Sequence, residues 1–151
     1  MNKSLQESLK PRPGGPALLF ERLTDLEPRT AQERVPLRTH DRDALFASIE
    51  KELGLLLDTR APQLIEDWRA MEKTVLCYGL PDTAHLSTAR GADRDMLKQL
   101  IEEAIAAFEP RLTNVHVSPL PARQGRFRFV LSAGVVIADM VEPISFPLEM
   151  R

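Results

Sequence analysis

The segment from Asp93 to Val117, DRDMLKQLIEEAIAAFEPRLTNVHV, constrains the fold of this chain more than any other stretch. Its apolar residues recur at steps of three and four, which is the period of one face of an α-helix. They are Met96, Leu97, Leu100, Ile101, Ala104, Ile105 and Phe108. Pro110 disfavours helical geometry in the residue before it, so a half-buried helix should end near Phe108 or Glu109. The chain is therefore expected to turn sharply at this proline.

Downstream of Pro110 the apolar period changes from about 3.6 to 2, which is typical of a half-buried β-strand. The predicted strand begins at Leu112, and its alternating apolar positions continue with Val115 and Val117. Pro119 and Pro121 lack the backbone N–H that a ladder needs, so they are expected to end it.

Two further strands are predicted after this one. Residues 125–140, GRFRFVLSAGVVIADM, alternate most regularly. Their inward positions would be Phe127, Phe129, Leu131 and Ala133. The last strand, Ile144–Leu148, turns Ile144, Phe146 and Leu148 inward. Its flanking and internal prolines restrict it to an edge of the sheet.

A short helix is predicted near the N-terminus, in the stretch ALLFERLTDLEP. Leu19, Leu23 and Leu26 fall on one face of this helix, and Pro28 marks its end. Isolated helices of fewer than about 12 residues are marginal in water. The apolar face of this one must therefore pack on the main body or on a partner.

Two longer helices are predicted between this segment and Asp93. The first follows Asp41, whose side chain can cap it, and ends near Asp58. The second begins near Gln63, and Gly79 is placed to close it in a left-handed conformation. Apolar positions are Leu45, Ile49, Leu53, Leu56 and Leu57 in the first helix, and Leu64, Trp68, Met71 and Val75 in the second. Asp93 is expected to be the N-cap of the long helix.

These segments together predict an α+β fold, in which N-terminal helices and one long helix pack on a small antiparallel β-sheet of about three strands at the C-terminal end. Residues 1–16 are rich in proline and glycine and predict a flexible N-terminal arm. Residues 17–151 are expected to form a single domain.

Composition excludes several classes of partner. With a net charge of -2, the chain has no basic excess to attract nucleic acid or anionic lipid. The longest apolar run, in residues 130–138, is too short to cross a bilayer as a helix, so no direct membrane insertion is expected. The single cysteine, Cys77, excludes an internal disulfide and fits a core position. With no signal-like apolar run at its N-terminus, the protein is expected in the cytoplasm.

Glu109 is placed unfavourably by ordinary helix rules. A carboxylate at a helix C-terminus faces the negative end of the macrodipole, which costs about 0.3 to 1 kcal/mol when exposed. An unfavourable residue at an element boundary suggests a role other than stability. One interpretation is that Arg111 simply neutralises Glu109 within the chain. The other is that both residues await a partner.

No catalytic, cofactor or metal site is predicted. His40, His85 and His116 stand apart from any Cys, Asp or Glu at a metal-ligand spacing, and His116 is expected to face solvent. Nucleotide-binding and nucleophile motifs are absent from the sequence. Glu109 could be paired with Asp82, Asp93 or Asp95 as the two carboxylates of a glycosidase. Aromatic residues, which line sugar clefts, make up only 5% of the chain, which disfavours that alternative.

Several phrases, in order along the chain, resemble one family. They are ALLFERLTDLEP, SIEKELGLLLDTRAP, VLCYGLPD, IAAFEPRLTNVHV and the closing FVLSAGVV and EPISFPLEM. This order, centred on Glu109, Pro110, Arg111 and Leu112, resembles the TssE family of baseplate subunits in the bacterial type VI secretion system. That family is related to the wedge protein of contractile phage tails, which has also carried a lysozyme label.

The resemblance implies a non-enzymatic structural subunit of a contractile injection machine, located at the inner face of the cytoplasmic membrane. Its Glu-Pro-Arg-Leu turn, residues 109–112, would bind the helical core bundle of neighbouring wedge subunits, and its body would initiate the contractile sheath. The implied partners are the baseplate proteins TssF, TssG and TssK and the sheath proteins TssB and TssC. An apolar final hairpin in a small sheet is also a candidate for strand addition by a neighbouring chain. The alternative is a peptidoglycan-cleaving hydrolase that uses Glu109 as its general acid.

Overall fold

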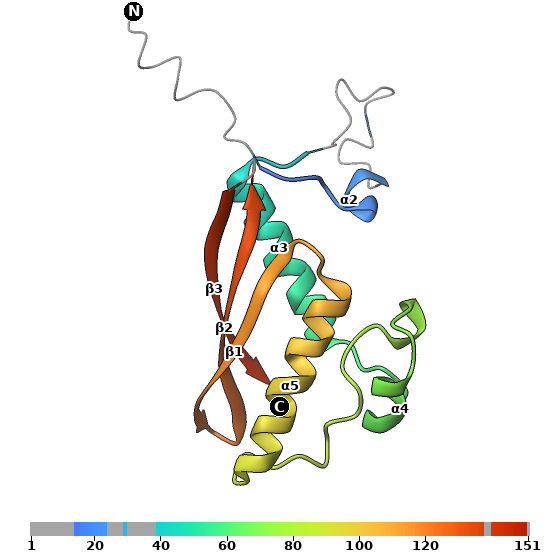
Figure 1. The fold of residues 1–151 in the computed structure, drawn as a ribbon, viewed down its shortest axis with the longest axis vertical. Coiled ribbons are helices and arrows are strands. Elements are labelled where there is room, and N and C mark those ends of the chain that lie inside the picture. The colour runs from blue at the N-terminus through green and yellow to red at the C-terminus, as the bar shows by residue number, and fades with distance from the viewer. Residues whose placement is uncertain (1–13, 24–28, 30–38, 138–139, 151) are drawn as a thin grey trace, which may run out of the picture. The chain divides into compact units, whose positions relative to one another are not determined.

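Four helices, a 3-10 turn and one three-stranded sheet make up the part of the chain described by the computed structural model, which is residues 14–23, 29, 39–137 and 140–150. The helices are α2 (Leu19–Leu23), α3 (Arg42–Asp58), α4 (Ile65–Ala70) and α5 (Gly91–Phe108), and the 3-10 turn η1 spans Val75–Cys77. The strands β1 (Leu112–Arg123), β2 (Arg126–Ile137) and β3 (Met140–Met150) lie in the order β1-β2-β3 (Figure 1). The predicted α+β fold, with its antiparallel sheet at the C-terminal end, is confirmed.

The chain divides into two compact units. The first comprises Met1–Ser48 and Ile137–Met140, and the second comprises Ile49–Val136 and Val141–Arg151. The boundary falls within α3, one residue before the end of β2 and one residue after the start of β3, so it does not coincide with the ends of the elements.

In the first unit, the chain beside the start of α3 is held by backbone contacts. Pro16 forms an isolated antiparallel bridge with Thr39, and the His40 N–H donates to the Gly15 carbonyl at 2.8 Å. The Ala44 N–H donates to Asp41 Oδ1 at 2.9 Å, which confirms Asp41 as the cap of α3. Residues 1–13 of the predicted arm lie outside the described residues.

The N-terminal helix differs from its prediction. Helix α2 has only five residues, and Leu23 is 71% exposed instead of turned onto an apolar neighbour. Leu26, the last position of the predicted apolar face, lies outside the described residues.

The core of the second unit lies between α5 and the sheet, where α5 packs along β1 (Figure 1). Helix α5 buries Leu97, Leu100, Ile101, Ala104 and Ile105, and β2 buries Phe127, Phe129, Leu131, Ala133 and Val135. The final turns of α3 contribute Ile49, Leu53, Leu56 and Leu57. Burying each large side chain of this kind stabilises the fold by about 1.5 to 3 kcal/mol. Met96 is 37% exposed, so the buried stripe of α5 is narrower than predicted.

The start of α5 also corrects a prediction. The helix begins at Gly91, with Arg90 in the N-cap position and no side-chain cap. Asp93 lies inside the first turn, where its carboxylate accepts a hydrogen bond from the Ser87 N–H at 2.9 Å. Asp93 is therefore not the N-cap. It fastens the preceding loop while keeping a negative charge at the positive end of the helix dipole.

The prediction that Pro119 and Pro121 end strand β1 is wrong, because the strand continues to Arg123. Pro119 pairs with Phe129 of β2 in the ladder. Among the described residues, β1 has β2 as its neighbour on one side and an open edge on the other. The nitrogen of a proline in β1, which carries no hydrogen, can face that open edge without the loss of a ladder hydrogen bond. The register shifts between Thr113 and His116, where Asn114 has a φ of 52°. The two remaining strands keep their predicted faces, and β3 extends beyond Ile144–Leu148 at both ends.

The helix predicted from Gln63 to Gly79 is wrong in length. Helix α4 stops at Ala70, and of its predicted apolar positions only Trp68 is buried. The Trp68 indole donates to the Cys77 carbonyl at 2.9 Å. Nine residues of continuous helix would separate these groups by about 13 Å along the axis, so the chain must fold back after Ala70 to make this bond. Gly79 has a φ of +105°, as predicted, but it follows η1. Cys77 is fully buried, as expected.

Candidate docking turn

The turn at residues 109–112 begins where α5 loses helical geometry. The Glu109 N–H makes the last helical bond, to the Ile105 carbonyl at 2.9 Å, and Glu109 itself has a φ of -122° and a ψ of 77°. The Leu112 N–H then donates to the Glu109 carbonyl at 3.1 Å, which closes a four-residue turn. Pro110, with its fixed φ, occupies the second position, and Leu112 opens β1. The predicted helix-to-strand junction is therefore confirmed.

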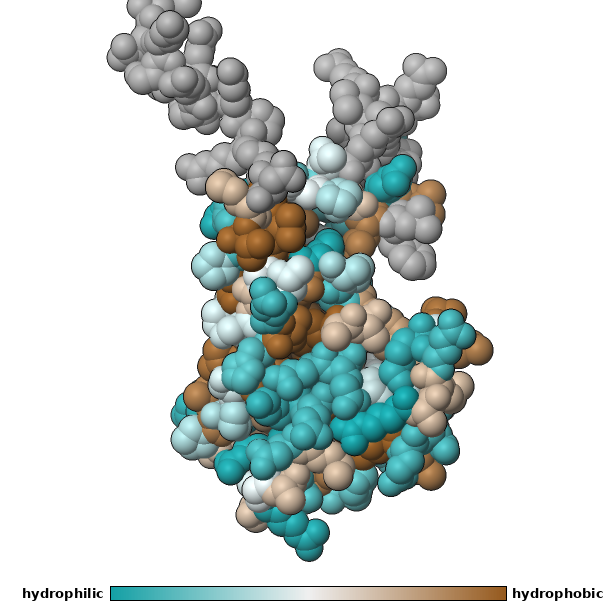
Figure 2. Space-filling view, in the orientation of Figure 1, coloured by the Kyte–Doolittle hydropathy of each residue, from teal (hydrophilic) through white to brown (hydrophobic). Residues whose placement is uncertain are grey.

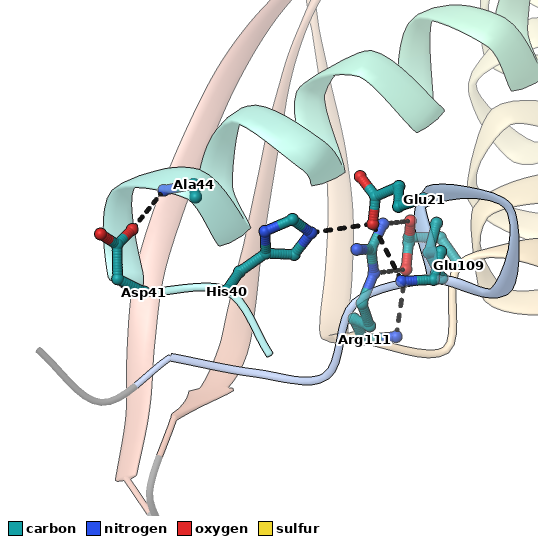
Figure 3. A network of polar contacts seen from close by, with 7 residues as sticks. Glu21, His40, Asp41, Ala44, Glu109 and Arg111 are labelled. Carbon is teal, nitrogen blue, oxygen red and sulfur yellow. Dashed lines mark hydrogen bonds and ion pairs between the residues drawn. The ribbon is translucent and has the colours of Figure 1, made fainter. Parts of the chain in front are cut away.

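Glu109 and Arg111 form a bidentate ion pair across this turn (Figure 3). Arg111 Nε donates to Glu109 Oε1 and Arg111 Nη2 donates to Oε2, each at 2.7 Å. The Arg111 backbone N–H also donates to Glu109 Oε1, at 3.2 Å. Both carboxylate oxygens therefore accept hydrogen bonds from the residue two positions on. The forked geometry is the strongest arrangement available to a guanidinium and a carboxylate.

This ion pair is buried. The side chains of Arg111 and Glu109 are 9% and 5% exposed. Removing one partner of a buried pair leaves an uncompensated charge and typically costs about 3 to 5 kcal/mol. The interpretation in which Arg111 neutralises Glu109 within the chain thus describes the geometry of the turn. It also explains how Glu109 is tolerated at a helix C-terminus.

The surroundings of the turn divide it into a buried and an exposed side. Phe108 packs edge-on against Tyr78, with ring centroids 5.3 Å apart. Burial raises the pKa of the Tyr78 hydroxyl, and the negative charges of Glu52 and Glu109 raise it further. Leu112 is buried at the start of β1, whereas Pro110 is exposed. Of the four predicted site residues, Pro110 is the one that projects to solvent.

A second polar cluster, in the first unit, was not anticipated from sequence. Glu21 Oε2 lies 2.8 Å from His40 Nε2 and accepts a hydrogen bond from the Leu18 N–H at 2.9 Å (Figure 3). Burial alone would raise the pKa of Glu21, but hydrogen bonds from His40, Ser48 and Leu18 outweigh it and lower the pKa to about 2. No helix or strand spacing in the sequence joins Glu21 to His40, because the two residues are 19 positions apart.

The residues considered above for a glycosidase or metal site make local structural contacts. The carboxylate of Asp82 accepts from the Ala84 N–H at 3.0 Å, as that of Asp93 does from Ser87. His116 is 63% exposed, as predicted, and lies 3.6 Å from a carboxylate oxygen of Glu102. Among the residues that the structure describes, no group of three or more potential ligands could hold a metal ion. Within the same residues, no helix has the length and apolar character needed to span a membrane.

Comparison with known proteins gives the chain a family. The family model described as baseplate wedge protein gp25 matches residues 43–139, which is more than half of the 151 residues. A chain from a structure titled "The baseplate complex from the type VI secretion system" is similar over 72% of this chain and 96% of its own length, with 17% identity and a TM-score of 0.49. No curated protein sequence matches. The family match runs from the first turn of α3, through the turn at residues 109–112, to just beyond the end of β2, and so this protein belongs to the family of the baseplate wedge protein gp25.

Proposed function

We propose that this protein is a non-enzymatic structural subunit of a type VI secretion baseplate, in which it joins the wedge and initiates the contractile sheath. The observation that carries the proposal is the match to the baseplate wedge family over residues 43–139. The ordered phrases that resemble TssE favour the type VI form of such a machine. In that setting the protein works in the cytoplasm, at the inner face of the cytoplasmic membrane.

In this proposal the Glu-Pro-Arg-Leu turn docks on the helical core bundle of the neighbouring wedge subunits. The ion pair of Glu109 and Arg111 supports the idea, because a turn fixed by three hydrogen bonds loses little conformational entropy on binding. The pair presents Pro110 at the surface in one conformation. Arg111 can also fork onto a carboxylate or a carbonyl of the partner if the ion pair opens on contact.

The remaining partners follow from the same setting. The wedge would contain TssF, TssG and TssK, and the sheath would contain TssB and TssC. Both outer strands of the sheet, β1 and β3, have only one neighbour in the order β1-β2-β3. An edge of this kind can accept a strand from a sheath subunit through backbone hydrogen bonds.

Capture of purified TssF and TssG by the immobilised full chain tests the docking role. Glu109→Ala and Arg111→Ala should each weaken capture by at least about tenfold, the size expected when a central anchor of about 1.4 kcal/mol or more is lost. The double variant Glu109→Gln/Arg111→Gln removes both charges, keeping the side-chain length at position 109 and shortening it at position 111. Because no buried charge is left without its partner, it should weaken capture with less effect on the fold.

The matched control is Arg126→Ala, which breaks a different and exposed ion pair, to Glu149 at 3.8 Å. Its capture should equal that of the unchanged protein. Helical circular dichroism of each variant shows whether the fold survives. Variants that keep their helical signal, capture the wedge normally and support normal sheath assembly would contradict the docking role.

The hydrolase alternative has a direct test of its own. A general acid must hold a proton on one oxygen, whereas both oxygens of Glu109 accept hydrogen bonds from Arg111. Incubation with purified peptidoglycan should therefore release no soluble fragments. Turnover that Glu109→Gln abolishes would overturn the non-enzymatic assignment.

A further inference from the structure

Four large apolar residues around α4 form an exposed patch in the second unit. They are Leu64, Met71, Val75 and Leu76, which are 66%, 42%, 84% and 73% exposed, and they are called the α4 patch below. Figure 2 shows apolar surface at the outer edge of the part that carries α4, bordered by hydrophilic surface. Single exposed apolar residues are ordinary, but several within one short segment are typical of an interaction surface.

The α4 patch is exposed although the segment beneath it is firmly held. Trp68 is fully buried, and its indole donates to the Cys77 carbonyl. Gln63 Nε2 donates to the Leu76 carbonyl at 3.2 Å, which ties the start of the segment to its end. Arg69 fixes α4 to α5 through Glu103 at 3.0 Å. The backbone that carries these four apolar side chains is therefore held in place by hydrogen bonds, and in this position the side chains stay exposed.

The charges beside the patch are unbalanced. Glu66, Asp67 and Glu72 are exposed, and within the described residues none of these three forms an ion pair. The two cations of the same segment are engaged: Arg69 pairs with Glu103, while Lys73 lies 4.0 Å from the centre of the Trp68 ring and donates to the Trp68 carbonyl. The surface offered to a partner is thus apolar with an acidic border.

We propose that the α4 patch binds an amphipathic helix of another protein whose apolar stripe is flanked by lysine and arginine. Leu64 and Met71 lie at the two ends of α4, seven residues apart, which is about two helical turns along the axis, and Trp68 between them on the same face is fully buried. An apolar stripe at i, i+3, i+4 and i+7 has the same length, so a partner helix can reach the exposed side chains at both ends of α4. Basic residues beside the stripe would pair with Glu66, Asp67 and Glu72. The charges of the partner would then meet opposite charges and not apolar surface. This surface shares no residue with the turn at residues 109–112.

Site-specific photo-crosslinking in cells tests the proposal with the full-length protein. A photoreactive amino acid replaces Leu76 in one variant and Leu55 in the control. Leu55 is 50% exposed on α3 and lies outside the patch. The crosslinked peptide is then sequenced by mass spectrometry. Position 76 should yield a segment of another protein with apolar residues at helical spacing and flanking lysine or arginine, and position 55 should not.

The segment so identified is then synthesised, and its affinity for the full chain is measured. Val75→Ser/Leu76→Ser should weaken binding at least about tenfold, and Leu55→Ser should not. Glu66→Lys/Asp67→Lys should weaken binding and reduce its salt dependence. Crosslinking at position 76 to a second copy of this chain, to an acidic or non-helical segment, or to nothing above the control would overturn the proposal. Because these variants leave Glu109 and Arg111 intact, the outcome is independent of the wedge-capture test.

Discussion

At the scale of single residues, the structure resolves the puzzle of Glu109. Helix rules identify it as misplaced, and they identify Arg111 as the cation within reach. They do not give the burial of the pair or the donation from the Arg111 backbone N–H, because both depend on how the turn folds. The sequence could therefore single out Glu109 and Arg111 as a possible ion pair, but not the closed geometry that they adopt.

Arg111→Ala should lower the free energy of unfolding by about 3 to 5 kcal/mol, because it leaves the buried Glu109 carboxylate without its cation. Glu109→Gln/Arg111→Gln should cost less than Arg111→Ala alone, since it removes both charges together. Urea denaturation of the two variants and the unchanged chain measures the difference. A loss below about 1 kcal/mol for Arg111→Ala would mean that the pair behaves as an exposed one.

Glu21 should make stability depend on pH in the acid range. Its pKa falls from 4.5 to about 2 on folding, so the unfolded chain binds this proton more readily. The stabilisation is present above about pH 4.5 and is lost as the pH falls towards 2. In thermal unfolding, Glu21→Gln should therefore be less stable than the unchanged protein at neutral pH, and this difference should shrink over that interval.

The matched control for this prediction is Glu66→Gln, which alters an exposed carboxylate that forms no ion pair within the described residues. Its unfolding midpoint should follow that of the unchanged protein at every pH. A stability difference for Glu21→Gln that stays constant from neutral pH to about pH 2 would show that the charge of Glu21 is not the cause.

At the scale of elements, the strongly periodic segments were predictable and the irregular ones were not. Helices α3 and α5 and strand β2 each repeat one apolar spacing over several turns or pairs, so local sequence determines them. Helix α4 shares the helical spacing but ends early, because the contact of Trp68 with Cys77 is tertiary. Strand β1 passes through Pro119 because it is an edge strand, and strand order is not written in the spacing of one segment.

Two glycines should respond oppositely to alanine. At Gly79, with a φ of +105°, an added Cβ would lie 2.4 Å from the Thr59 carbonyl oxygen. Gly79→Ala should therefore destabilise the chain by about 1 to 3 kcal/mol. At Gly54, inside α3, an added Cβ meets nothing within 4 Å, so Gly54→Ala should stabilise by up to about 1 kcal/mol. Chemical denaturation compares the two variants, and equal effects would contradict this account of the backbone.

At the scale of the whole molecule, the family match and the proposed surfaces indicate a protein that works by binding other subunits of an assembly. The matched region, residues 43–139, contains both α5 and the turn that joins it to the sheet. The docking turn and the α4 patch lie in the same compact unit. An assembly subunit needs surfaces of this kind more than it needs a cleft, and the resemblance to TssE was the part of the sequence that indicated such a role.

The most direct measurement is a cryo-electron microscopy structure of a type VI baseplate wedge purified with this protein in place. We expect the chain to be present, with residues 109–112 in contact with a helical bundle of the neighbouring wedge subunits and the first sheath layer resting on its sheet. A purified wedge and sheath that assemble fully without this chain, or a wedge in which the turn faces solvent, would contradict the account.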